Sequence, residues 1–167
     1  MDIKKGNQEF LNILENNKQL KDRRDELVKG QNPDTLVITC SDSRVVPEYI
    51  FNASLGELFV IRTAGNVINE GELATVEYAI EHLKVKRIIV LGHTHCGAIH
   101  AAINNEHGMY LDQILRRIRK NISIITDETM ASKMNIIEEV NYLKEKFPNY
   151  EGTIESMMYD IESSEVF

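Results

Sequence analysis

Short aliphatic runs and helical patterns alternate along the 167-residue chain, and this alternation indicates how the chain folds. The aliphatic runs are continuous rather than alternating with polar residues, which is typical of strands buried on both faces of a sheet. A polar turn or a glycine follows each run and ends it. The pattern predicts three buried strands, over residues 36–38, 58–61 and 87–91.

Apolar residues recur at helical spacing in the segments around these strands. In the first segment Phe10, Leu11 and Leu14 lie among charged residues, and the pattern ends near Gly30 and Pro33. The expected helices cover residues 7–28, a short segment that opens at 47, and residues 73–83, 109–120 and 132–147.

Strands that alternate with helical crossovers predict a mainly parallel central sheet with helices on either side, so the expected fold class is α/β. Residues 153–160 and 165–167 are expected to form a last strand or hairpin at the edge of this sheet. The chain has no internal repeat and no linker-like tract. We therefore expect residues 1–167 to form one domain, with residues 1–30 as an N-terminal helical arm.

Charge and composition exclude some classes of function. The 19 Lys and Arg residues against 26 Asp and Glu residues give a formal net charge of −7. A protein that binds the phosphate backbone of a nucleic acid needs a concentrated basic surface instead. The longest aliphatic or aromatic run has four residues, far short of the ~20 of a membrane span, and the N-terminus lacks a secretory pattern. We expect a cytoplasmic protein without nucleic-acid or membrane partners, whose two cysteines are free thiols or metal ligands.

Residues able to bind a metal follow two of the predicted strands. Cys40 ends the first strand, and His93 and Cys96 come directly after the third. Because ligands bind beyond the carboxyl ends of parallel strands, these side chains are expected to share one crevice. Two thiolates and an imidazole form a zinc ligand set that leaves one tetrahedral position open, as catalytic zinc sites do. The alternatives are cysteines that only fill the core, and His95 as a ligand in place of His93.

Asp42 and Arg44 follow the first of these cysteines. Asp42 could occupy the open metal position itself and close the site. The planar fork of Arg44 can instead hold that carboxylate with two parallel hydrogen bonds, which leaves the position to water. The alternative is an Asx turn with a surface ion pair.

These residues lie in two segments, CSDSRV at 40–45 and GHTHCG at 92–97, that resemble the signature motifs of the β-class carbonic anhydrases. The resemblance includes RTAGN at 62–66 and covers roughly residues 31–102. It implies one Zn²⁺ per chain bound by Cys40, His93 and Cys96, and a catalytic dyad of Asp42 and Arg44. It also implies reversible hydration of carbon dioxide to bicarbonate and a proton by a zinc-bound hydroxide.

The resemblance also concerns the assembly. It implies a homodimer or larger homo-oligomer with active sites at the subunit interface, and we expect the arm at 1–30 to pack on a partner subunit. Gln31 matches a family glutamine that reaches the neighbouring subunit's site and binds substrate there.

Two other functions remain open on the same residues: hydrolysis of carbon disulfide or carbonyl sulfide, and a non-catalytic zinc-stabilised binding module. His95, His100 and His107 are candidates for moving the proton, and none is singled out.

Overall fold

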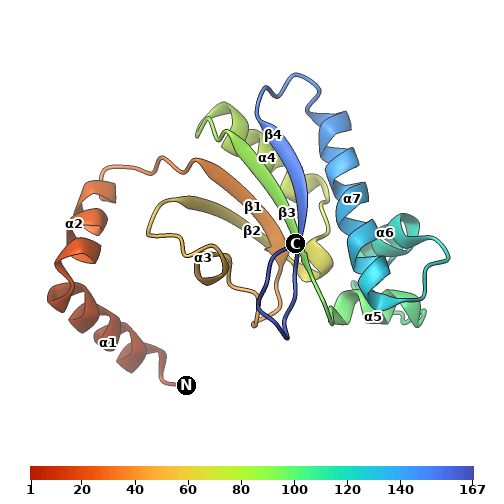
Figure 1. Ribbon diagram of the computed structural model, residues 1–167, viewed down its shortest axis with the longest axis horizontal. Coiled ribbons are helices and arrows are strands. Elements are labelled where there is room, and N and C mark those ends of the chain that lie inside the picture. The colour runs from red at the N-terminus through yellow and green to blue at the C-terminus, as the bar shows by residue number, and fades with distance from the viewer.

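The computed structural model describes residues 1–167 and contains one sheet of four parallel strands in the order β2-β1-β3-β4 (Figure 1). The strands are β1 (Thr35–Cys40), β2 (Leu58–Thr63), β3 (Arg87–His93) and β4 (Thr153–Tyr159). The predicted α/β class and mainly parallel sheet are confirmed. The expected edge element is also present, because β4 pairs only with β3, and the chain then returns to form an antiparallel bridge between Tyr159 and Val166.

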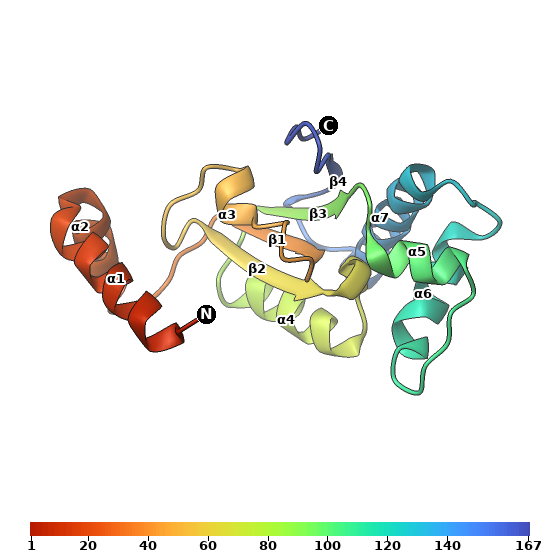
Figure 2. The same ribbon diagram turned by 90° about the horizontal axis from the view of Figure 1, so that it is seen from below.

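Helices cover the two faces of the sheet unequally. The helical elements are α1 (Ile3–Asn16), α2 (Lys18–Leu27), α3 (Pro47–Ile50), the 3₁₀ turn η1 (Ala64–Asn66), α4 (Glu70–Glu81), α5 (Gly97–Ile103), α6 (Asp112–Ile122) and α7 (Glu128–Lys146). Helices α4 and α7 pack on one face, and the short α3 lies on the other, above the sheet in Figure 2. Helices α5 and α6 lie beside α7, close to the carboxyl ends of β1 and β3.

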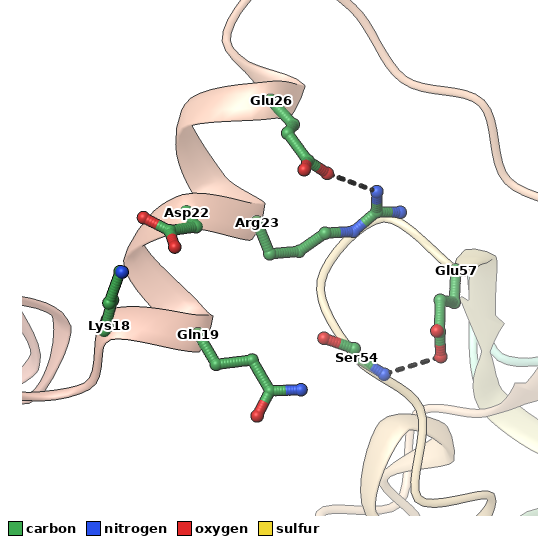
Figure 3. Close-up of a pocket in the computed structure, with 7 residues that line it drawn as sticks. All are labelled: Lys18, Gln19, Asp22, Arg23, Glu26, Ser54 and Glu57. Atoms are coloured by element: carbon green, nitrogen blue, oxygen red, sulfur yellow. Dashed lines mark hydrogen bonds and ion pairs between the residues drawn. The ribbon is translucent and has the colours of Figure 1, made fainter.

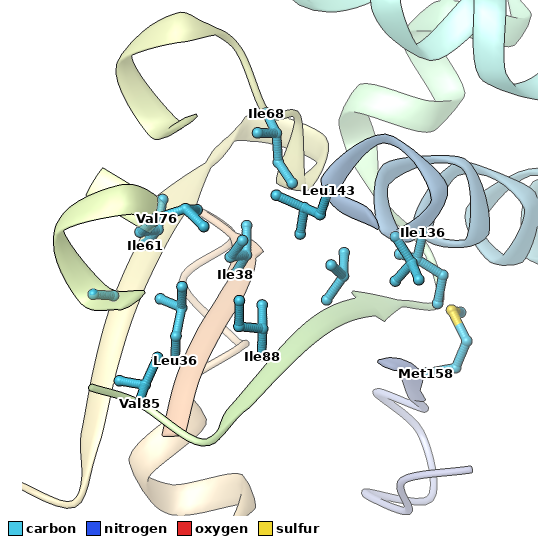
Figure 4. Packing of buried hydrophobic residues seen from close by; sticks show 13 residues of the cluster. Leu36, Ile38, Ile61, Ile68, Val76, Val85, Ile88, Ile136, Leu143 and Met158 are labelled. Carbon is cyan, nitrogen blue, oxygen red and sulfur yellow. The ribbon is translucent and has the colours of Figure 1, made fainter. Parts of the chain in front are cut away.

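The core follows from the two-residue period of the buried strands. Leu36 and Ile38 point to the face covered by α4 and α7, where they pack with Ile88 (Figure 4), and Val37 between them points to the α3 face. Each fully buried aliphatic side chain of this kind contributes roughly 1.5–3 kcal/mol to folding. The prediction that all three strands are buried on both faces is wrong for β2, of which only Ile61 is buried, because β2 lies at an edge of the sheet.

The predicted helix over 7–28 is in fact two helices, α1 and α2, separated by Asn17. The backbone of Asn17 is extended (φ −118°, ψ 95°), and its side chain accepts a hydrogen bond of 3.0 Å from the Leu20 N–H group. Asparagine is a favoured N-cap residue because it can satisfy one of the free N–H groups that open a helix. This cap interrupts the apolar pattern without a proline or glycine.

The two helices form an arm that extends from one edge of the body (Figure 1). Arg23 of α2 donates a hydrogen bond of 3.0 Å to the carbonyl oxygen of Leu55. Arg23 also lines a cleft of about 810 Å³ that is formed by polar and charged residues alone (Figure 3). Gly56 has a positive φ of 77°, and a Cβ there would lie 2.6 Å from a methyl carbon of Leu27, so glycine allows this close approach.

No helix in the structure combines the length and the hydrophobicity that crossing a bilayer requires.

Candidate metal centre

Three potential metal ligands meet where two neighbouring strands end. Cys40 is the last residue of β1, His93 is the last residue of β3, and Cys96 is the N-cap residue of α5. All three are buried, and their ligand atoms lie within 4.8 Å of one another. The structure thus brings together the three residues that the sequence suggested, because β1 and β3 are adjacent and parallel.

The imidazole of His93 is oriented as a metal ligand requires. Its Nδ1 atom lies 2.8 Å from the carbonyl oxygen of Thr94, which can only accept, so Nδ1 carries the proton. The other ring nitrogen, Nε2, is buried and has no hydrogen-bond partner. A buried polar atom without a partner is costly, and a neutral imidazole nitrogen with a free lone pair is a common zinc ligand. A backbone carbonyl on the second ring nitrogen is the usual support of such a ligand.

The two sulfur atoms lie 4.0 Å apart. A hydrogen bond from the Cys96 thiol lowers the pKa of the Cys40 thiol to about 4. Conversely, the pKa of Cys96 is raised, because its proton is held between the two sulfurs and a second negative charge would be buried beside the first. A cation between them removes this conflict. Two sulfurs bound tetrahedrally at about 2.3 Å lie about 3.8 Å apart, so the donor set and its spacing fit Zn²⁺.

Backbone N–H groups also face the sulfur atoms. The Gly65 N–H group donates to Cys40 Sγ at 3.3 Å, and the N–H groups of Ala98 and Ile99, at the start of α5, face the sulfur of Cys96. Hydrogen bonds to sulfur favour the thiolate over the thiol. The surroundings therefore suit two metal-bound thiolates better than two neutral cysteines that fill space.

Asp42 and Arg44 form a two-point ion pair beside this cluster. Arg44 donates to Asp42 through Nε at 3.0 Å and through Nη2 at 2.8 Å, and its backbone N–H group donates to the same carboxylate at 2.9 Å. These hydrogen bonds from Arg44 hold the pKa of Asp42 well below its usual range, so the carboxylate is ionised. Arg44 Nη2 also donates to the carbonyl oxygen of His95 at 3.1 Å, which links the pair to the segment that carries Cys96.

Arg62 supports the same segment and was not recognised from the sequence as a site residue. Its guanidinium donates to the carbonyl oxygen of Cys40 at 3.2 Å and to that of Asp42 at 2.6 Å. The position follows from the pairing of β1 with β2, which sets Thr39 opposite Arg62. The RTAGN segment at 62–66 belongs to the resemblance noted from the sequence, but the contact of Arg62 with these carbonyl oxygens follows only from the strand order.

The remaining candidates lie outside the cluster. The ring nitrogens of His95, His100 and His107 lie 3.2, 2.6 and 3.2 Å from carboxylate oxygens of Glu162, Glu128 and Asp112, respectively. Gln31 is exposed, four residues before the amino end of β1. Because a strand rises about 3.3 Å per residue, β1 alone separates its two ends by roughly 16 Å. Gln31 is therefore remote from the cluster of its own chain.

Known proteins are similar to this chain in sequence and in fold. A sequence profile of the carbonic anhydrase family matches residues 35–166. Carbonic anhydrase 2 of Mycobacterium tuberculosis is 38% identical over 126 residues, and the match covers 72% of this chain and 61% of that protein, so the chain corresponds to only part of this relative's length. The solved β-carbonic anhydrase CcaA is 33% identical, with a TM-score of 0.74 and coverage of 87% of this chain and 84% of that chain. A tetrameric β-carbonic anhydrase from Sordaria macrospora is 26% identical, with a TM-score of 0.77 and coverage of 96% of both chains.

Proposed function

The chain belongs to the β-class carbonic anhydrase family, and we propose that it catalyses the reversible hydration of carbon dioxide to bicarbonate and a proton. The observation that carries the proposal is the buried cluster of Cys40, His93 and Cys96 beside a carboxylate that an arginine holds. The residues that match the carbonic anhydrase family profile, 35–166, include that cluster.

Cys40 Sγ, His93 Nε2 and Cys96 Sγ are the atoms that would hold one Zn²⁺ per chain. When bound there, Zn²⁺ supplies a Lewis acid that brings the pKa of water towards neutrality. Two thiolates and a neutral imidazole cancel the charge of the ion, whereas three imidazoles leave it at +2. The sulfur ligands therefore polarise water less, and turnover is expected to rise on the alkaline side of neutrality.

Asp42 acts on the reacting water. Its ionised carboxylate is an acceptor only, so it orients water by taking a hydrogen bond from it. Arg44 already donates to both oxygens of Asp42. This two-point hold favours a carboxylate that stays beside the metal over one that binds it and closes the site.

The experiment that tests this function is stopped-flow measurement of carbon dioxide hydration between about pH 6.5 and 9, with zinc per chain determined on the same sample. Activity that rises with pH at about one zinc per chain is expected. The variant Cys40→Ser should lose zinc and activity together. Bound zinc without hydration would contradict the proposal, and sulfide release from carbon disulfide would then identify the hydrolase, whereas no turnover of either substrate would favour a binding module.

The second part of the proposal is a homodimer or larger homo-oligomer in which the arm packs on another copy of the chain. Four apolar residues of α1, namely Ile3, Phe10, Leu11 and Ile13, are between 42% and 71% exposed. An apolar helix face of this kind is stabilised by burial against another surface. The tetrameric Sordaria macrospora enzyme matches 96% of this chain, so it has a counterpart of most of the arm. In such an assembly Gln31, at the base of the arm, would serve the partner's site.

Sedimentation of the purified protein tests the assembly. The variant Phe10→Glu should dissociate the oligomer, because a charge on the apolar face cannot be buried without a partner. The variant Gln8→Glu introduces the same charge at an exposed polar position of α1 and should leave the oligomer intact. A wild-type protein that sediments as a monomer would contradict the assembly without touching the proposed chemistry.

A further inference from the structure

A chain of buried and partly buried hydrogen bonds runs from the candidate metal centre into the interface between α6 and α7. Asn135 of α7 is completely buried, and its Nδ2 atom donates to the carbonyl oxygen of Gly65 at 3.0 Å. The N–H group of the same glycine donates to Cys40 Sγ at 3.3 Å. One glycine therefore connects a side chain of α7 to a sulfur atom of the metal cluster.

Gly65 is a residue that needs such an external restraint. Its φ of 66° lies in the left-handed region, and a Cβ there would lie 2.8 Å from the Cδ1 atom of Ile118 and 3.0 Å from the Cβ atom of Ala98. Glycine adopts this conformation without strain and leaves both neighbours in place. The same freedom lets the backbone turn its N–H group away from the sulfur unless another contact holds it.

The carboxamide of Asn135 is itself held in one orientation. Its Oδ1 atom accepts a hydrogen bond of 3.0 Å from Asn121, so its Nδ2 atom is the group that faces Gly65. Asn121 also donates to Glu139 at 3.0 Å, and Glu139 is bound at two points by Arg117. Each hydrogen bond on the path from the Arg117–Glu139 ion pair through Asn121 and Asn135 to Gly65 therefore joins a donor to an acceptor.

We propose that Asn135 is a positioning residue that holds Gly65 so that its N–H group stays on the Cys40 thiolate. A hydrogen bond to a metal-bound thiolate withdraws charge from the sulfur and so reduces the charge that the sulfur gives to the metal. Asn135 thereby affects the acidity of the metal centre through two hydrogen bonds, its own to Gly65 and that of Gly65 to Cys40. The inference rests on the proposed metal site.

Cobalt substitution tests this role by a spectroscopic signal. In the variant Asn135→Leu, the near-ultraviolet sulfur-to-cobalt charge-transfer band should move to longer wavelength, because a thiolate without its hydrogen bond gives up charge more easily. Zinc affinity should fall about tenfold, as is usual when a supporting group is lost. The pH midpoint of hydration should move upwards, because more charge on sulfur makes the centre less acidic.

A matched control lies one turn earlier on the same helix. Ser132 is also buried, and its Oγ atom has no hydrogen-bond partner, so Ser132→Ala should leave the band, the affinity and the midpoint unchanged. An Asn135→Leu band at the wild-type position would overturn the proposal. A wild-type protein without any sulfur-to-cobalt band would instead contradict the metal site itself, so the two failures are distinguishable.

The smaller variant Asn135→Ala makes the same test if the leucine variant does not fold. If neither folds, the wild-type protein loaded with NMR-active cadmium decides the question. A coupling between cadmium and the Gly65 amide proton is expected across the hydrogen bond to Cys40. Its absence would remove the contact through which Asn135 is proposed to act.

Discussion

Two arginine–carboxylate pairs with the same two-point geometry lie in different regions of this molecule. Arg44 binds Asp42 through Nε at 3.0 Å and Nη2 at 2.8 Å, and Arg117 binds Glu139 through the same atoms at 2.9 and 2.8 Å. In the first pair the arginine and carboxylate side chains are 49% and 15% exposed, and in the second they are 17% and 0% exposed. The two pairs therefore have similar hydrogen bonds but differ in how far their side chains are exposed to water.

The carboxylates respond in opposite ways. The hydrogen bonds of Arg44 lower the pKa of Asp42, whereas burial raises the pKa of Glu139 despite the opposing effect of Arg117. Removal from water disfavours the charged form, and in the interior this effect outweighs the partner. The pair near the surface is therefore suited to chemistry with water, and the buried pair to joining α6 to α7.

The largest effect is expected where the buried pair is broken. The variant Arg117→Met leaves the carboxylate of Glu139 buried without a counterion, which should cost about 3–5 kcal/mol of unfolding free energy at pH 7. Denaturant unfolding measures this loss. The matched variant Arg44→Met, in the exposed pair, should change stability much less, because water can solvate the free carboxylate. Equal losses in the two variants would show that exposure does not distinguish the pairs.

Replacing both partners sharpens the same comparison. The double variant Arg117→Met/Glu139→Leu should be more stable than Arg117→Met alone, because it leaves no buried charge. A double variant that is no more stable would mean that the lost stability comes from packing, for example from the Arg117 guanidinium, which lies 3.8 Å from the Tyr142 ring centroid.

The exposed pair is expected to matter for turnover instead. In Arg44→Met, carbon dioxide hydration should fall roughly 10–100-fold, the usual loss when a group that orients a reacting side chain is removed. Zinc content should stay near that of the wild type, since Arg44 contacts Asp42 and a backbone carbonyl but none of the three candidate ligands. Undiminished turnover would argue against the dyad.

The two pairs also differ in how stability depends on pH. In Arg117→Met the folded-state pKa of Glu139 should rise further above its unfolded value of about 4.3, so the folded state binds the extra proton. The stability of this variant should then increase as the pH falls from 7 towards 5, by at most about 1.4 kcal/mol per pH unit. Asp42 has the opposite sign: its lowered pKa contributes stability that is lost only as strongly acidic pH is reached. Adding Glu139→Gln to Arg117→Met should abolish the increase.

A third pair, His100 with Glu128, should show the smallest effect. Both side chains are substantially exposed, at 57% and 39%, and the hydrogen bond that His100 donates to the Glu128 carboxylate raises the pKa of His100. A raised histidine pKa contributes stability that is present below about pH 6.5 and is lost as the pH rises through the folded-state value. The variant Glu128→Gln should lower the His100 pKa in an NMR titration, and an unchanged titration would contradict the pairing.

Much of the fold was predictable because continuous aliphatic runs and helical periodicity are local properties. The parallel sheet and its edge strand followed from them, and so did the expectation that Cys40, His93 and Cys96 meet at the strand ends. The break at Asn17 was missed because a helix cap depends on one side chain rather than on periodicity. The half-exposed state of β2 was missed because burial depends on strand order.

The sequence alone determined the alternation of strands and helices and the donor atoms of the candidate metal centre, because both depend on neighbouring residues and short spacings. The tertiary structure decided which residues support those donors. Arg62 reaches the site only because β2 pairs with β1, and Asn135 reaches Gly65 from 70 residues away. The sequence marks Arg62 only as part of the RTAGN segment and does not mark Asn135 at all, because a long-range hydrogen bond depends on how whole elements pack against one another.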